Sequence, residues 1–195
     1  AAAAAARMRS PVYATSSYLH MYFNSSLVSG TYVAGSILAL LASIRIAKTM
    51  KRFHTYKFCV AVAVLEMVVV GLFGLTNITF LLPILFMAHF VLQTLLYITL
   101  NVFVESFSAH AKIGSIRGLF LAILNMGILI SPLIGGMILT YYSFATLYMV
   151  AALMLVPYLF LVRKYLSHVP EPAYHTINLF DALRREFNDA LSDTL

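Results

Sequence analysis

The sequence contains no tryptophan, a single cysteine and few charged residues. Only 10% of its 195 residues are charged, whereas 62% are hydrophobic, and the mean hydropathy is +0.90. A water-soluble domain carries about a quarter charged residues. Because so little charge is available to cover a soluble surface, we expect a polytopic membrane protein. Without tryptophan, tyrosine and phenylalanine must supply any aromatic belt at the membrane interfaces.

The scarcity of cysteine and of catalytic patterns excludes several function classes. Cys59 has no second cysteine with which to form an internal disulfide. The six histidines lack the spacing of metal ligands, and the chain contains no H-E-x-x-H, G-x-S-x-G or phosphate-loop sequence. We therefore expect neither an enzyme nor a protein with a metal or cofactor.

The net charge of +6 does not indicate nucleic-acid binding, because the basic residues cluster in short linkers between apolar runs. This distribution is typical of membrane orientation, in which Lys and Arg mark the cytoplasmic side. We expect an integral protein of the cytoplasmic membrane with both ends cytoplasmic. The basic residues of the linkers are Arg45, Lys48, Lys51, Arg52, Lys57, Lys112, Arg117, Arg163 and Lys164.

Five apolar runs have about the length that crosses 30 Å of hydrocarbon at about 1.5 Å per residue. A sixth span, the first in the chain, is incomplete and ends within residues 11–23. The sequence thus predicts an all-α bundle of six transmembrane helices over residues 1–168. The five complete runs are 29–47, 57–75, 78–103, 117–139 and 145–162.

The remaining segment, 169–195, has a different composition. Pro170 and Pro172 end the last membrane helix. Apolar residues then recur at helical spacing between charged ones, from Ile177 to Leu191, which predicts a cytoplasmic amphipathic helix. We expect it to dock on the bundle, with a partner protein or the lipid interface as alternatives.

The run 117–136 combines high apolarity with small residues at fixed intervals. A helix with such a face allows close approach of another helix, and Pro132 bends it. An ordinary packing face is the simplest interpretation. The residues of this pattern are Arg117, Gly118, Gly127, Ser131, Pro132, Gly135 and Gly136.

This pattern resembles the fifth-helix motif of the major facilitator superfamily of secondary transporters, especially its antiporter branch, with Ser131 where the family has glycine. The linker 47–57 keeps only the basic character of the family's other motif. The resemblance implies the N-terminal six-helix half of a transporter. It also implies a second six-helix half in the same or another chain, and a small-molecule substrate bound near the midplane.

Polar residues recur every four positions in the run 78–103, at His89, Gln93, Tyr97 and Asn101. In a helix they form one stripe, which should face protein or water rather than lipid. In the resembled fold this helix and the first line the central cavity. The resemblance therefore implies substrate contacts for the stripe and for Tyr18 of the first helix. Hydrogen bonding to neighbouring helices is the alternative.

Three ionisable residues are candidates for proton coupling. His89 is one of them because histidine is the residue type used most often to carry a proton near neutral pH. Glu66 stands alone within an apolar run, where a bare carboxylate is costly, and structural pairing is as reasonable as coupling. Glu105 extends the stripe at its cytoplasmic end.

We expect secondary active transport of a small molecule by alternating access, coupled to protons. The alternative is a non-transporting scaffold or assembly subunit that packs through 117–136.

Overall fold

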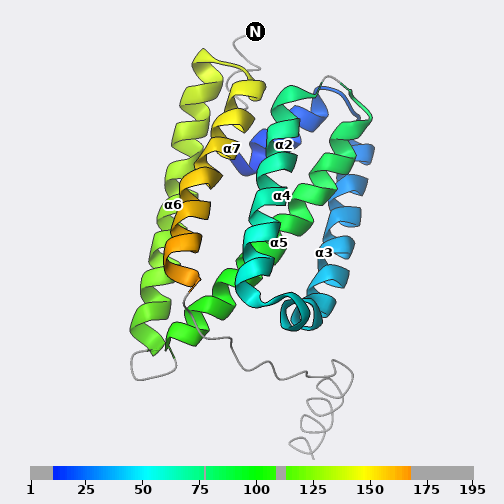
Figure 1. The fold of residues 1–195 in the computed structure, drawn as a ribbon. Helices are drawn as coiled ribbons and strands as arrows, with labels where there is room; N and C mark the ends of the chain where they lie inside the picture. The colour runs from blue at the N-terminus through cyan, green and yellow to red at the C-terminus, as the bar shows by residue number, and fades with distance from the viewer. Residues whose placement is uncertain (1–10, 77, 109–112, 168–195) are drawn as a thin grey trace, which may run out of the picture.

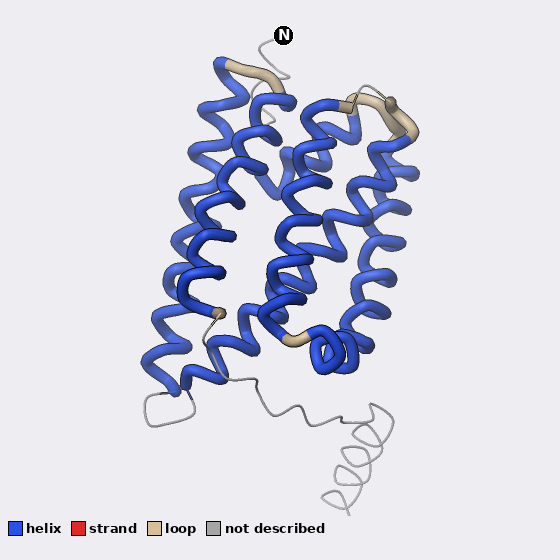
Figure 2. The backbone as a smooth tube through the Cα atoms, in the orientation of Figure 1, coloured by secondary structure: helices blue, strands red, loops and turns tan. Residues whose placement is uncertain are grey.

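The computed structural model describes residues 11–76, 78–108 and 113–167, which form helices joined by short turns, with no β-strand among them (Figures 1 and 2). The expectation of an all-α protein is confirmed for this part of the chain. In order, the helices are α2 (Pro11–His20), α3 (Ser25–Phe53), α4 (Thr55–Leu75), α5 (Leu81–Ser108), α6 (Ile113–Tyr141) and α7 (Phe144–Leu161), followed by the π-helical turn η1 (Val162–Leu166).

Five of these helices are long and apolar enough to cross a membrane, namely α3 to α6 and α7 with η1. They correspond to the five predicted runs and indicate an integral membrane protein. Short α2 is the described part of the expected first helix, whereas residues 1–10 and the predicted amphipathic helix in 169–195 lie outside the described residues. A bundle of six spans remains a prediction.

Polar residues set several helix ends beyond the predicted bounds. The Asn24 side chain accepts a hydrogen bond from the Leu27 amide at 3.0 Å, so α3 starts four residues before the predicted run. Ser143 caps α7 in the same way through the Thr146 amide. At its other end, α3 continues to Phe53, because long basic side chains extend from a helix end into the polar interface.

The helix α4 lies at the centre of the arrangement. It packs mainly against α7 and α5, and α5 packs in turn against α3. Phe73, Cys59 and Ala63 of α4 are almost fully buried, as is Leu82 of α5. Figure 1 shows α5 crossing obliquely behind α4, with α2 in the upper half of the bundle.

The two ends of the bundle differ in charge. The α3–α4 connection and η1 lie at the lower end in Figure 1 and carry Arg52, Lys57, Arg163 and Lys164. The turns at the upper end contain no Lys or Arg within the described residues. The helices therefore present one basic end, as the charge pattern of the sequence predicted.

The helix α6 is the least buried of the five spans. A Cβ atom added at Gly118, Gly127 or Gly136 would meet no atom within 4 Å, although Gly135 is buried. The helix continues through Pro132. Within the described residues, most of the small-residue face of α6 thus has no closely packed neighbour.

Close packing instead occurs at the contact between α4 and α7. A Cβ on Gly74 would lie 2.9 Å from the Ala145 carbonyl oxygen and 3.1 Å from Met149. We expect Gly74→Ala to lower the free energy of unfolding by about 1–3 kcal/mol, because α7 must shift. The Cβ of Gly71→Ala, on the same helix, would meet only Ala152 at 4.0 Å and should cost little. Thermal unfolding in detergent measures both, and equal midpoints would contradict this packing.

Candidate functional site

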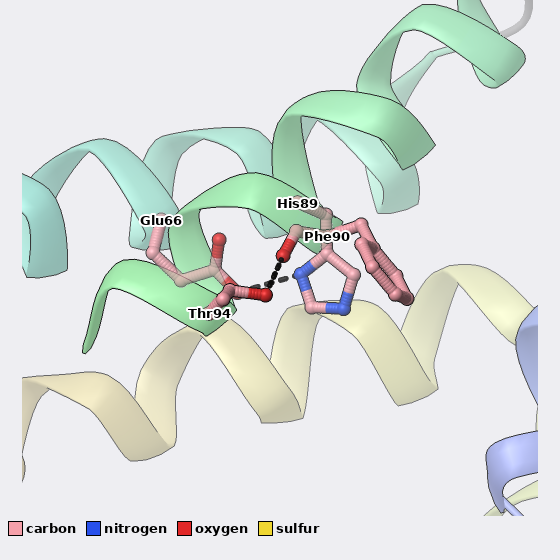
Figure 3. A network of polar contacts seen from close by, with 4 residues as sticks. All are labelled: Glu66, His89, Phe90 and Thr94. Atoms are coloured by element: carbon pink, nitrogen blue, oxygen red, sulfur yellow. Dashed lines mark hydrogen bonds and ion pairs between the residues drawn. The ribbon is translucent and has the colours of Figure 1, made fainter. Parts of the chain in front are cut away.

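An ionisable pair joins α4 and α5 within the apolar part of the bundle. Glu66 lies near the middle of α4, and its Oε1 is 2.6 Å from Nδ1 of His89 on α5. Figure 3 shows the two side chains pointing toward each other, with the second ring nitrogen of His89 directed away from Glu66. In the sequence, both residues were separate candidates for proton coupling, and the structure places them in direct contact.

The two partners differ in access to their surroundings. The Glu66 side chain is 6% exposed, whereas that of His89 is 26% exposed. The other carboxyl oxygen, Oε2, is buried and has no hydrogen-bond partner. The ring of Phe73 meets the imidazole edge-on, with centroids 6.4 Å apart. Glu66 is therefore the inner member of the pair, and His89 the member that reaches outward.

This geometry places one proton between a carboxyl oxygen and a ring nitrogen. The bond holds one proton whether the contact joins carboxylate with imidazolium, carboxylic acid with imidazole, or carboxylate with a neutral imidazole protonated at Nδ1. The first two forms are neutral overall, which removes most of the cost of burying a carboxylate in an apolar region. His89 is the partly exposed partner, so its ring is where the pair can exchange a second proton with the surroundings.

The remaining members of the predicted stripe lie along α5 below His89. Gln93, Tyr97 and Glu105 are exposed, and Asn101 is partly buried. The Asn101 amide donates to the Tyr97 carbonyl at 2.8 Å, within α5 itself. Glu105 lies about 24 Å from His89 along the helix axis at about 1.5 Å per residue, so it is not part of the ionisable pair.

Gln93 differs from the small polar residues of the same helix. The hydroxyls of Thr94, Thr99 and Ser106 each donate to the carbonyl one turn earlier, which satisfies them without a partner helix. Figure 3 includes the bond from Thr94 to Phe90. The Gln93 amide makes no hydrogen bond within the described residues. It therefore presents two donors and an acceptor at membrane depth.

Tyr18 occupies a different environment from the stripe. Its ring is 8% exposed and belongs to an aromatic cluster of α2, α4 and α7. Its centroid lies 5.0 Å from Phe144 and 5.5 Å from Tyr148, and Tyr148 stacks on Phe73 at 4.9 Å. In this structure Tyr18 thus packs in the core between three helices.

Two further contacts had no clear signal in the sequence. Cys59 Sγ lies 3.5 Å from the Tyr158 hydroxyl, which joins α4 to α7 in the buried core. The aromatic stack of Phe73 and Tyr148 links the same helices. Neither could be read from spacing, because each pair joins positions far apart in the chain. Among the described residues, no cluster of three metal-ligating side chains occurs.

We expect His89→Ala to lower the free energy of unfolding by up to about 3 kcal/mol, because both Glu66 oxygens would then be buried without a partner. Replacing both residues by leucine should recover most of this loss, since no polar atom of the pair remains. Gln93→Ala, at an exposed position without a partner, is the control and should change little. Chemical denaturation in detergent measures all three. A double variant no more stable than His89→Ala would contradict this interpretation of the pair.

No family model, curated protein or solved structure matches this chain.

Proposed function

We propose that this chain forms one half of a secondary transporter, which moves a small molecule across the cytoplasmic membrane by alternating access and couples this movement to protons. The observation that carries the proposal is the exposed polar face of α5, which descends from His89 through Gln93 and Tyr97. The resemblance of 117–136 to the major facilitator superfamily motif supports the same proposal.

The polar face of α5 favours a water-filled cavity over contact with lipid. Unpaired amide and hydroxyl groups are costly in hydrocarbon, and polar residues inside membranes usually face protein or water. Gln93 is exposed although the span around it is strongly apolar. A second six-helix half, in the same or another chain, would supply the opposite wall of this cavity.

The Glu66–His89 pair is suited to hold the coupling proton. At its partly exposed ring, His89 exchanges protons with the cavity, while Glu66 behind it balances the charge. Uptake of a second proton makes the imidazolium and the neutral carboxylic acid coexist, which weakens their contact. Loss of that proton restores the short bond, so the α4–α5 contact senses proton occupancy.

The basic end of the bundle sets the proposed orientation. Lys and Arg near membrane spans favour the cytoplasmic side. The connection at His54 and the turn η1 would then face the cytoplasm. His89 would lie toward the external side of the α5 midpoint, because α5 runs from the end without Lys or Arg to the basic end.

A cysteine at position 93 should react with a membrane-impermeant thiol reagent in intact cells or vesicles, because the proposed cavity holds water. Leu153→Cys is the matched control, since Leu153 is 63% exposed on apolar α7 and should face lipid. Native Cys59 is fully buried and should not react. If Gln93→Cys is no more reactive than Leu153→Cys, position 93 lacks a wet cavity and the transport proposal fails.

Protonation of the pair is visible without knowledge of the substrate. When the pH is lowered until the pair takes up its second proton, imidazolium and carboxylic acid coexist, and infrared difference spectra should show a protonated carboxyl in a buried environment. Glu66→Gln should abolish this band and His89→Gln should shift its pH dependence. The control, Glu105→Gln, removes an exposed carboxyl and should leave the band unchanged. A band that survives Glu66→Gln would exclude Glu66 as the proton carrier.

A scaffold function is the second candidate, and the open face of α6 favours it. Gly118, Gly127 and Gly136 leave room for a partner helix. A scaffold requires neither a hydrated position 93 nor a titrating Glu66. The labelling and infrared experiments therefore separate the two functions.

A further inference from the structure

A groove of about 400 Å³ lies between α4 and the last span, away from the Glu66–His89 pair. Its α4 wall consists of Tyr56, Val60 and Val64, which are spaced four residues apart and so follow one another along a single helix face. Its other wall comes from Leu159 and Phe160 at the end of α7 and from Arg163 in η1.

The groove changes character along its length. Its polar side chains, Tyr56 and Arg163, stand near the basic end of the bundle, at the start of α4 and in η1. Toward the membrane interior the walls are aliphatic or aromatic. Val64 is 40% and Phe160 66% exposed, so the groove opens outward rather than into the core. It therefore has a polar head region and an apolar body.

The polar end of the groove carries positive charge. Within the described residues Arg163 forms no ion pair with a carboxylate. Lys57 and Lys164 follow Tyr56 and Arg163 in the chain, and both are exposed. The amino end of α4 adds the positive partial charge of its helix dipole. An anion at this end would meet a guanidinium, which binds phosphate in a bidentate manner.

We propose that this groove binds one anionic phospholipid, with its phosphate head group at Arg163 and Tyr56 and an acyl chain along Val60 and Val64. Charge complementarity selects the head group, since basic pockets between membrane helices on the cytoplasmic side suit anionic lipids. This inference is independent of the proposed transport function, because it needs neither the α5 stripe nor the ionisable pair.

The length of the groove favours a lipid chain over a transmembrane helix. From Tyr56 to Val64 the groove runs about 12 Å at about 1.5 Å per residue, and six residues line it. A transmembrane helix needs an apolar contact along much of the roughly 30 Å of hydrocarbon, whereas the upper part of one acyl chain fits a groove this short.

Native mass spectrometry of the full-chain protein in detergent tests the proposal. The protein is titrated with dioleoyl phosphatidylglycerol, with dioleoyl phosphatidylcholine of identical chains, and with inorganic phosphate. We expect one phosphatidylglycerol to bind more tightly than phosphatidylcholine. We expect no retained inorganic phosphate, because it lacks the chain that fills the apolar body.

Two pairs of variants separate the head-group contact from the chain contact. Arg163→Gln should weaken phosphatidylglycerol binding about fivefold, the equivalent of about 1 kcal/mol per basic residue, and leave phosphatidylcholine unchanged. Its control is Arg45→Gln, an exposed arginine on α3. Val64→Phe fills the groove and should weaken both lipids, whereas Val33→Phe on exposed α3 should weaken neither. Unfolding midpoints recorded in parallel verify that each variant is folded.

Several results would overturn the proposal. Equal affinity for the two lipids would show that the groove does not select an anionic head group. An equal effect of Arg45→Gln would assign the preference to diffuse charge over the basic end. Arg163-dependent retention of inorganic phosphate would indicate an ion site, and a dimer that excludes lipid would show that a second copy covers the groove.

Discussion

A carboxyl group in the middle of an apolar helix requires a partner wherever that helix is placed, and this requirement fixes the position of α4. Glu66 meets this requirement through the short contact of its Oε1 with His89, while its Oε2 has no hydrogen-bond partner. The contact sets the rotation of α4 and its register against α5. Cys59, Glu66 and Phe73 are seven residues apart and so share one face of α4. The buried face of α4 therefore packs against α7 as well as α5, with Phe73 stacked on Tyr148 and Cys59 beside Tyr158.

The predictable part of this structure is the part that depends on local composition. Each of the five apolar runs corresponds to a helix, because about twenty consecutive apolar residues have few other ways to satisfy their backbone in lipid. Helix ends were less predictable: Asn24 and Ser143 extend or start helices through single side-chain hydrogen bonds, which hydropathy does not register.

The candidate site was only half visible in the sequence. Glu66 and His89 were conspicuous as ionisable groups in apolar runs, but their contact depends on how two helices rotate and slide against each other. Spacing within one helix says nothing about that. For the same reason the sequence does not reveal the groove at Arg163, whose walls come from α4, α7 and η1. The open face at Gly127 illustrates a related limit. A pattern of small residues indicates that a neighbouring helix could approach closely, but it does not indicate which helix that is.

Chain order gives the packing of α4 a consequence for membrane insertion. Proteins fold from the N-terminus while they are synthesised, so α5 follows α4 directly and can neutralise Glu66 as soon as the hairpin of the two helices enters the bilayer. The residues of α4 that pack on α7 remain without that neighbour until α6 has been inserted and α7 follows. During this interval Gly74 and Phe73 face lipid or the insertion machinery, which tolerate an apolar surface far better than a lone carboxylate. The order of helices thus satisfies the costly polar group early and leaves only apolar surface to the last step of assembly.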